Sequence, residues 1–508
     1  METSSYLTCL KTVNGALDRT RRFIKRLKLG RAAGYDGITA EHLKHCDNPM
    51  LLSLLSMLFN SCVQFGMIPA TFKTGILVPI LKKPGLDPSK ANHYRPIIVS
   101  SVISKLLEYA IIEDSSKHVF HPLQYGFVDG RGTKMAISTT QDIITYCNNR
   151  GSPVYTCGLD VEKAFDGVPH CVLLHKSLGI IDDKWWRILY VWYHGSSAMV
   201  KHMGKLSQPF SLKAGTRQGG LTSPLLFNIV YQDMISMLST TTGGLRIKEN
   251  TYNVICYADD LLLMSLTVTG LQRLINCANE YVTKMGISFN ADKSVCAIFG
   301  KKSFMQTPEW TLNGSLIELK NEVEHLGAIL HSTRSTSYHI EQRLGRCRRA
   351  FYSLQAAGMC ENGVKPCTKG YLWNTALQPV LLYATDCLPL RKEDIRRLET
   401  LQAKLVKASL GLHKFLRTTP LIQAMNIKKV ETLIDCQSLK LLKGIMFNDS
   451  KSKDFYLHLI RTNFAGNTLL MRVKNVCDKT DLKSICTVLF NDVNTQNCIK
   501  KTEVRSCQ

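Results

Sequence analysis

Two adjacent aspartates, Asp259 and Asp260, lie between apolar runs at residues 254–257 and 261–264. This pattern predicts a β-hairpin with both acids at its tip, where a tight turn lets both carboxylates approach one site. Carboxylates beside so many Leu, Ile and Val side chains are costly unless a cation compensates for their charge. The hairpin is therefore a candidate cation site.

A third acid, Asp160, ends another apolar run at residues 154–159. Mg²⁺ prefers hard oxygen ligands and usually takes one or two carboxylates plus substrate phosphates. Two such ions can clamp the attacking and leaving oxygens of a phosphoryl transfer. An isolated Asp-Asp pair is more often a solvated turn, but the second strand-end acid and the basic character of the chain favour a metal site here.

A glycine-rich segment at residues 215–220 (Gly-Thr-Arg-Gln-Gly-Gly) leads into a helical pattern. It lacks the ending of a P-loop and the glycine spacing of a dinucleotide site. Its glycines permit close approach of the backbone to a ligand, and Arg217 and Gln218 offer donors. Taken alone, the segment is better explained as a turn at the start of a helix.

Other catalytic or targeting signals are weak. No HExxH or GxSxG sequence supports a zinc protease or a serine hydrolase. The 18 cysteines are scattered without any CxxC, which fits neither a zinc ribbon nor a disulfide scaffold. The N-terminus is polar and no run reaches the roughly 18 apolar residues of a spanning helix. We therefore expect a reducing, intracellular location, no secretion and no membrane partner.

The composition points to a folded protein with a polyanionic partner. The chain has 508 residues, of which 45% are hydrophobic, so it can bury real cores and is not disordered. It carries 64 Lys plus Arg against 40 Asp plus Glu, a formal net charge of +24. By charge alone, such an excess suits either nucleic acid or an acidic membrane surface as partner.

Strand and helix patterns alternate up to about residue 335, which predicts an α+β core. Strands are expected at 76–81, 154–159, 254–257 and 261–264, and helices at 40–65, 102–112, 218–239 and 268–285. Pro79 suggests that the first strand lies at a sheet edge. The helical segment 40–65 is expected to bury its leucines, including Leu54.

Basic helices are expected at both ends of this core. Residues 19–31 predict a cationic helix, which is either a solvated face or a nucleic-acid contact. After residue 335 the segments 340–351 and 393–410 combine helical apolar spacing with many Arg and Lys, which suggests a separate basic helical domain. Residues 451–508 are polar and indicate no function.

The motifs, taken in order, resemble the reverse transcriptases of non-LTR (LINE-type) retrotransposons. Residues 257–260 (Tyr-Ala-Asp-Asp) resemble their catalytic palm hairpin, residues 159–166 their first catalytic aspartate motif, and residues 215–228 their template- and nucleotide-positioning motif. Four further segments follow the family order, at residues 92–97, 124–127, 286–293 and 325–327. Seven segments in order make the resemblance specific.

The resemblance implies a right-hand polymerase fold. It consists of fingers, a palm with an antiparallel sheet and the catalytic hairpin, and an all-α basic thumb. The expected boundaries are 1–71 for an N-terminal basic fingers extension, 72–332 for the fingers and palm, 333–450 for a helical thumb-like domain and 451–508 for an unassigned tail.

The same resemblance assigns the catalytic and metal role to Asp160, Asp259 and Asp260, with two Mg²⁺ ions for which Mn²⁺ can substitute. It implies that Phe165 excludes a 2′-hydroxyl from the incoming nucleotide and that Arg95 contacts the triphosphate. The full nucleotide-binding set is Arg95, Phe165, Gln218 and Lys293, with Lys293 near the leaving pyrophosphate.

Template and primer contacts are implied for a second set of residues. Leu326 and Gly327 correspond to the primer grip, and the arginines after residue 340 belong to a thumb that recognises duplex shape and phosphates. This set is Gly219, Gly220, Leu326, Gly327, Arg343 and Arg346. One departure is that Val128 and Asp129 stand where relatives commonly have a basic residue and a proline, which weakens a template contact.

The implied function is an RNA-directed DNA polymerase that extends a primer 3′-hydroxyl with dNTPs on an RNA template. The expected partners are the RNA template, the DNA primer or target, dNTPs and a separate endonuclease, since about 70 residues before the fingers leave no room for a nuclease. The implied location is the nucleus with a cytoplasmic ribonucleoprotein stage. Two alternatives stay open: an inactive or domesticated nucleic-acid-binding remnant, and a maturase-like RNA-binding protein.

Overall fold

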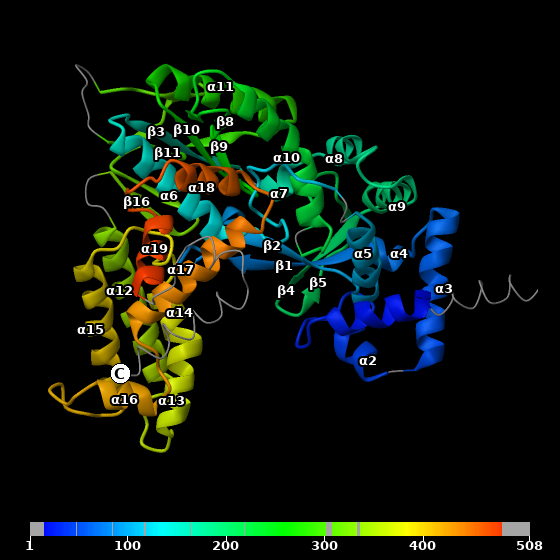
Figure 1. The fold of residues 1–508 in the computed structure, drawn as a ribbon. Coiled ribbons are helices and arrows are strands. Elements are labelled where there is room, and N and C mark those ends of the chain that lie inside the picture. The colour runs from blue at the N-terminus through cyan, green and yellow to red at the C-terminus, as the bar shows by residue number, and fades with distance from the viewer. Residues whose placement is uncertain are drawn as a thin grey trace, which may run out of the picture. The chain divides into compact units, whose positions relative to one another are not determined.

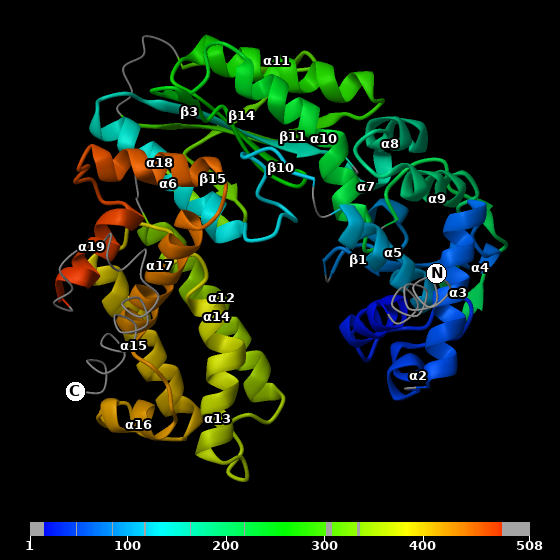
Figure 2. The same cartoon turned by 45° about the vertical axis from the view of Figure 1, so that its right-hand side comes forward.

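The computed structural model describes residues 15–46, 48–83, 85–115, 118–162, 164–217, 219–300, 307–332 and 336–479. The chain forms two compact units, each built from segments that are far apart in sequence (Figure 1, Figure 2). Unit 1 comprises Met1–Phe120, Val161–Asp233 and Tyr281–Ser288; unit 2 comprises His121–Asp160, Met234–Glu280 and Phe289–Gln508. Strands and helices alternate in both, so the α+β expectation is confirmed.

Unit 1 contains a five-stranded sheet. Its strands are β1 (Thr74–Leu81), β2 (Tyr94–Val99), β4 (Ser197–His202), β5 (Lys205–Leu206) and β6 (Phe210–Ser211). The order is β2-β1-β4-β5, with β6 also paired to β4. β1 is antiparallel to β2 and parallel to β4.

The expected edge position of β1 is wrong, because β1 lies between β2 and β4. Its pairing with β4 covers Thr74 to Leu77 and ends before Pro79. Its pairing with β2 continues, with Pro79 opposite Pro96. The missing N–H of Pro79 therefore falls beyond the ladder with β4, where it removes no bond to that strand.

Helices surround this sheet. They are a helix at residues 15–26, α2 (Ala40–His45), α3 (Pro49–Phe65), α4 (Ala70–Lys73), a short 3₁₀ turn at Ala91–His93, α5 (Val102–Ser115), α7 (Ala164–Gly167), α8 (His170–Ser177), α9 (Asp183–His194) and the start of α10 (Ser223–Thr240). α5 confirms the helix expected at 102–112. The helical segment expected at 40–65 is divided into α2 and α3, because Asn48 and Pro49 begin a new helix.

Local sequence sets the ends of α3. The Asn48 side chain accepts from the Met50 amide, Pro49 occupies the first turn, and Gly66 ends the helix at φ +62°. The helix buries Leu52 and Leu55.

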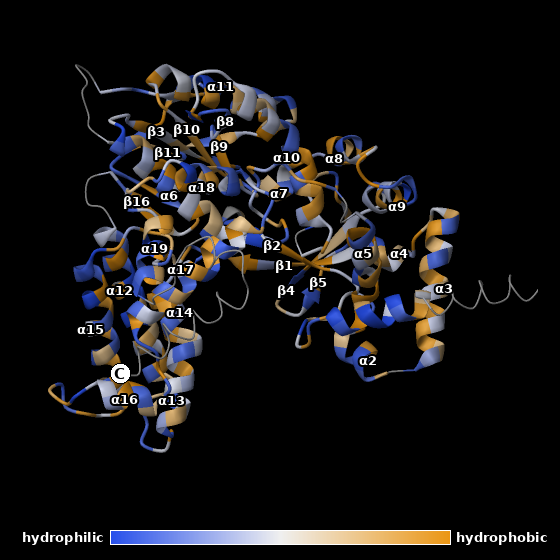
Figure 3. Cartoon of the chain, viewed as in Figure 1, coloured by the Kyte–Doolittle hydropathy of each residue, from blue (hydrophilic) through white to orange (hydrophobic). Residues whose placement is uncertain are grey.

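One expected core position on α3 is wrong: Leu54 is 58% exposed. At 3.6 residues per turn it falls on one face with Met50 and Met57, which are also exposed, opposite the buried face. Figure 3 shows hydrophobic residues at several positions along α3. Because the exposed face also carries apolar residues, periodicity alone could not select the core face.

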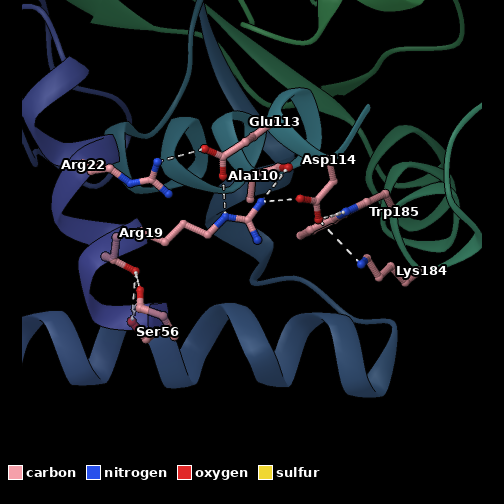
Figure 4. Close-up of polar contacts among 10 residues, drawn as sticks. Arg19, Arg22, Ser56, Ala110, Glu113, Asp114, Lys184 and Trp185 are labelled. Atoms are coloured by element: carbon pink, nitrogen blue, oxygen red, sulfur yellow. Dashed lines mark hydrogen bonds and ion pairs between the residues drawn. The ribbon is translucent and has the colours of Figure 1, made fainter. Parts of the chain in front are cut away.

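Acids at the end of α5 hold the first helix in place (Figure 4). The Arg19 guanidinium lies 2.7 Å from Glu113 and 2.6 Å from Asp114, and Arg22 lies 3.5 Å from Glu113. Trp185 of α9 donates its indole N–H to Asp114 at 2.8 Å. Arg19 thus ties the first helix to α5, a role that the basic sequence pattern did not indicate, whereas Arg22 is 65% exposed.

Unit 2 contains a second sheet in the order β14-β11-β3-β10-β9. Its strands are β3 (Val154–Val161), β9 (Val254–Tyr257), β10 (Asp260–Ser265), β11 (Phe289–Phe299) and β14 (Glu318–Lys320). β10 is antiparallel to both β3 and β9, with Leu159 opposite Leu261. The strands next to β10 read as almost continuous apolar runs because they are buried on both faces.

Helices cover both faces of this sheet. Figure 1 and Figure 2 show α11 (Val268–Lys284) on one side and α6 (Thr133–Asn149) on the other. Short hairpins complete the sheet region: β7 (Arg246–Ile247) with β8 (Asn250–Thr251), β12 (Thr311–Leu312) with β13 (Ser315–Leu316), and β15 (Glu322–His325) with β16 (Ala328–His331).

The region after residue 335 is helical, as expected. It comprises α12 (Ser337–Ala356), α13 (Pro366–Leu372), a π-helical turn at Trp373–Leu377, α14 (Gln378–Leu381), α15 (Lys392–Ser409), α16 (Thr419–Ala424) and α17 (Val430–Met446). These helices share one apolar cluster that includes Ile340, Phe351, Leu398 and Leu405. None of the helices within the described ranges combines the length and apolar character needed to cross a bilayer.

Two further helices, α18 (Lys451–Arg461) and α19 (Leu469–Lys479), occupy part of the segment that the sequence left unassigned. A buried carboxyl connects them to α6: Asp142 accepts from the Tyr456 hydroxyl at 2.7 Å and from the Leu469 amide at 2.9 Å. Asp142 is 1% exposed, and burial raises its pKa to about 7.

This carboxyl predicts a pH-dependent stability. Folded Asp142 binds its proton up to about pH 7, whereas the ordinary pKa is 3.8. Between pH 3.8 and about 7 the folded state therefore binds one proton more than the unfolded state. The free energy of unfolding should fall as the pH rises through this range. In Asp142→Asn this part of the slope should disappear, as measured by denaturant unfolding at several pH values.

The matched control is Asp454→Asn, which removes a carboxylate of α18 that is 45% exposed. It should keep the wild-type slope. Equal slopes in the wild type and in Asp142→Asn would contradict the assigned protonation.

Candidate active site

The acid-tipped hairpin predicted from the sequence is confirmed. β9 and β10 are joined by Ala258 and Asp259, with Tyr257 opposite Asp260. Ala258 has φ +57°, a left-handed conformation that is uncommon outside glycine. Asp259 thus lies in the turn and Asp260 at the start of β10, so strand alternation does not separate them.

A buried amide side chain supports this turn. Gln124 is 1% exposed, and its Oε1 accepts from the Ala258 amide at 3.1 Å and from the Gly126 amide at 2.8 Å. The Tyr125 amide also donates to the Cys256 carbonyl at 2.8 Å. The 124–127 motif therefore braces the acid-tipped hairpin directly, within unit 2.

Gly126 has no room for a side chain. A Cβ atom there would lie 2.4 Å from the Ala258 nitrogen. Backbone cannot yield as the tip of a flexible side chain can, so a larger residue would displace the turn that carries Asp259.

Asp160 lies near the end of β3, beside β10. Its amide donates to Ser294 Oγ at 3.3 Å, and Ser294 Oγ donates to the Asn290 carbonyl at 2.7 Å. Lys293 Nζ lies 3.5 Å from Asp160 Oδ2. Ser294, directly after the 286–293 motif, therefore helps to position Asp160, and Lys293 of the motif supplies a cation beside it.

Most of the predicted site residues of unit 2 line one pocket of about 350 Å³. Its polar lining includes Asp160, Asp260, Lys293, Lys320, Glu322 and Glu324, and Leu326 also contributes. Residues from four sequence motifs thus meet in this pocket.

The acids in and beside the pocket repel one another. Desolvation raises the pKa of Asp260 to about 6, with further contributions from the charges of Asp259, Asp160 and Glu324. A bound cation would relieve this repulsion, so the donor set fits Mg²⁺. Within the described ranges no three acidic, His or Cys side chains meet closely enough to hold one ion alone. An ion here would also need substrate oxygens or water.

The turn between β15 and β16 is held by the helical region. Leu326 and Gly327 have φ +52° and +77°. The Tyr383 hydroxyl donates to the Leu326 carbonyl at 2.6 Å, and Arg343 Nη2 donates to the Gly327 carbonyl at 3.3 Å. Leu326 lines the acidic pocket, so these contacts fix one wall of it.

Arg343 differs from its expected role. It is 5% exposed and its guanidinium lies 5.0 Å from the centre of the Tyr383 ring. A buried guanidinium cannot contact a nucleic-acid backbone from the surface; Arg343 instead supports Gly327. Arg346 is more exposed, at 39%, and lies 4.0 Å from Glu324.

The glycine-rich loop belongs to unit 1. Gly219 has φ +106°, and a Cβ atom there would lie 2.6 Å from the Ile98 carbonyl oxygen. At Gly220 a Cβ atom would lie 3.0 Å from Ser223 Oγ. These glycines therefore let the loop pack against β2 and the start of α10. Gln218 lies outside the described residues.

Two buried charged side chains, Arg217 and Glu108, lie in and beside this loop. The Arg217 guanidinium is buried over the Trp192 ring, 5.1 Å from its centre. Burial lowers the pKa of Arg217, and the negative charge of Glu108 opposes this lowering. Glu108 Oε2 accepts from the Thr222 amide at 2.8 Å. Sequence reasoning missed Glu108, although an acid within the apolar helix 102–112 was a usable signal.

The other predicted nucleotide contacts also lie in unit 1. The Phe165 ring stacks on Phe227 with centroids 4.3 Å apart, and the Phe165 carbonyl accepts from the Thr216 amide at 2.7 Å. Arg95 is exposed on β2, opposite Ile80. Phe165 is thus fixed to the glycine-rich loop and α10, while Arg95 is accessible to a ligand.

Comparisons with known proteins agree with the motif order. Residues 80–330 match the family described as reverse transcriptase (RNA-dependent DNA polymerase). The chain is 24% identical, over 426 residues, to the RNA-directed DNA polymerase from mobile element jockey of Drosophila funebris, covering 82% of this chain and 46% of that protein. It is 22% identical, over 431 residues, to the probable RNA-directed DNA polymerase from transposon BS of Drosophila melanogaster, covering 81% and 46%.

A third relative is the Pol polyprotein of the type-1 retrotransposable element R2 of Popillia japonica, 25% identical over 75% of this chain and 53% of that protein. The chain thus spans about half the length of the curated relatives that it matches. A solved telomerase from Candida tropicalis, truncated from its C-terminal domain, shares 15% identity at a TM-score of 0.35 over 55% of this chain and 59% of that chain, too weak a likeness to argue from.

The strand-end aspartate, the acid-tipped hairpin and the glycine-rich loop all fall inside the matched segment. Residues 80–330 thus match the reverse transcriptase family, and the chain is similar to the RNA-directed DNA polymerases of non-LTR retrotransposons.

Proposed function

We propose that this chain is the RNA-directed DNA polymerase of a non-LTR retrotransposon, extending a primer 3′-hydroxyl with dNTPs on an RNA template. The observation that carries the proposal is the meeting of Asp160 with the Asp259–Asp260 hairpin on neighbouring strands of one sheet. Intact acids in this arrangement argue against the inactive remnant that the sequence left open.

Asp160, Asp259 and Asp260 would hold two Mg²⁺ ions, or Mn²⁺ in their place. When bound, such ions neutralise the transferred phosphate and lower the pKa of the attacking hydroxyl. Lys293 would carry its positive charge beside Asp160 toward the leaving pyrophosphate. The protein itself orients the carboxylates through the Ser294 and Gln124 hydrogen bonds.

The remaining assignments follow from the same proposal. Leu326 and Gly327 would grip the primer, Gly219, Gly220 and Gln218 would face the template and nucleotide, and Arg346 would approach the duplex. Arg343 acts as a positioning residue through Gly327. The segments 1–71, 72–332 and 333–450 would serve as fingers extension, fingers with palm, and thumb. A separate endonuclease and a nuclear location with a cytoplasmic ribonucleoprotein stage belong to this proposal.

The metal-site carboxylates give the most direct test. Asp259→Asn should reduce Mg²⁺-dependent primer extension on an RNA template to below detection, because it removes one negative charge where the metal would bind. Extension is measured on a gel with a labelled DNA primer. Asp454→Asn, an exposed carboxylate of α18, is the matched control and should extend the primer normally. A folded wild-type protein that binds primer–template yet adds no nucleotide would contradict the proposal.

Phe165 should discriminate between sugars. Its ring is restrained by the stack on Phe227, and a rigid ring beside the sugar penalises a 2′-hydroxyl. Phe165→Val should raise the ratio of kcat/KM for rNTP to that for dNTP by about tenfold. The control is Phe210→Val in β6, an exposed ring of the same unit. An unchanged ratio in Phe165→Val would show that this ring is only a packing residue.

The brace behind the hairpin gives a third test. Gly126→Ala should lower kcat by about a hundredfold, because a displacement of the Asp259 turn of about 1 Å misplaces a catalytic group. Gly132→Ala, a glycine of the same unit with no atom within 4 Å of a Cβ, should retain activity. Both variants are compared by primer extension and by thermal unfolding. Normal kcat in Gly126→Ala would mean that the turn tolerates the shift.

A further inference from the structure

The loop between α15 and α16 is fixed by two buried lysines. Lys407 is 9% exposed, and its ammonium donates to the carbonyls of Lys414 at 2.7 Å and Leu416 at 3.1 Å. Lys369 is 5% exposed and donates to the Ser409 carbonyl at 2.8 Å, at the end of α15. Charged donors that satisfy backbone carbonyls are among the stronger hydrogen bonds, so this loop has a defined shape.

That shape directs an aromatic ring outward. Phe415 lies between the two carbonyls that Lys407 holds, and it is 80% exposed. In Figure 1 the loop extends beyond the ends of α15 and α16. A single exposed ring is not by itself a binding site. Here the braced loop holds the Phe415 ring in a defined position where a ligand can reach it.

The chain on either side of this ring is basic in sequence. Residues 400–430 contain six Lys or Arg and no Asp or Glu. Lys414 Nζ lies 5.0 Å from the centre of the Phe415 ring, and the His413 ring lies 5.1 Å from it. Arg417, also exposed, follows two residues later. A ligand for this loop must therefore offer both a flat apolar face and negative charge.

We propose that the loop at residues 410–418 binds an unpaired polynucleotide strand, with a base stacked on Phe415 and phosphates near Lys414 and Arg417. Aromatic rings beside basic residues suit single strands, because every base has a face to stack and every nucleotide a phosphate. Paired bases in a duplex are already stacked and cannot take this position. The inference rests on the nucleic-acid partner of the proposed function, but binding can be tested without catalysis.

The test measures binding of the full chain to fluorescein-labelled 12-nucleotide single strands, RNA and DNA in separate arms, and to the matching duplex. The buffer contains EDTA and no dNTPs, so polymerase activity does not enter. Phe415→Ala should weaken single-strand binding by about fivefold or more and duplex binding by less than about twofold. Phe415→Trp should restore it, and the RNA and DNA arms identify the preferred strand.

The matched control is Tyr371→Ala, which removes a ring of α13 that is 66% exposed. It should bind both ligands as the wild type does. Equal losses for single strand and duplex in Phe415→Ala, or no loss at all, would overturn the proposal. The proposal would also be overturned if Phe415→Ala lost binding to phosphatidylserine vesicles but kept its affinity for the strands. That result would make the loop a membrane contact.

These outcomes are separable from those of the primer-extension assay. A wild-type protein that extends primers but shows no selective effect of Phe415→Ala would retain the polymerase assignment and lose the strand-binding loop. A selective effect in a protein that does not polymerise would retain the loop and remove the polymerase.

Discussion

The pocket at the ends of β3 and β10 depends on holding like charges together. The raised pKa of Asp260 shows what this costs, since partial desolvation and three neighbouring acids all oppose its ionisation. Only a rigid frame keeps carboxylates in such a place. The sheet supplies that frame: β10 is paired on both sides, with Leu261 opposite Leu159 on β3 and opposite Cys256 on β9.

Turns near this frame are fixed by polar side chains from distant parts of the chain. Gln124 binds the amide of Ala258, and Tyr383 binds the carbonyl of Leu326. In the helical region Lys407 does the same from nearby in the chain, for the loop that carries Phe415. Each anchor is mostly or partly buried, where an unmade hydrogen bond is expensive, so each turn has one preferred shape. Backbone conformations such as φ +57° at Ala258 persist because of these anchors.

Local patterns in the sequence predicted much of the fold. The apolar runs around the two adjacent aspartates gave the hairpin, and helical spacing gave α3, α5, α11 and α15. Local patterns failed where a partner chosen by the tertiary fold decides the outcome. Pro79 suggested an edge strand because proline lacks an N–H. The second neighbour of β1, β4, lies more than a hundred residues further along the chain, so local sequence could not reveal it. Leu54 suggested core because α3 is apolar on more than one face.

The sequence by itself determined which chemical groups this protein has. The acids, the glycine-rich loop, the excess of basic residues and the order of the motifs can all be read from it directly. Only the tertiary structure decided which of these groups meet. Asp160, Asp260 and Lys293 line one pocket in the folded chain. Arg343 is buried, and Glu108 accepts a hydrogen bond from the Thr222 amide beside the glycine-rich loop. The physical reason is that a residue type fixes which interactions a group can make, whereas burial and long-range pairing fix which ones it does make.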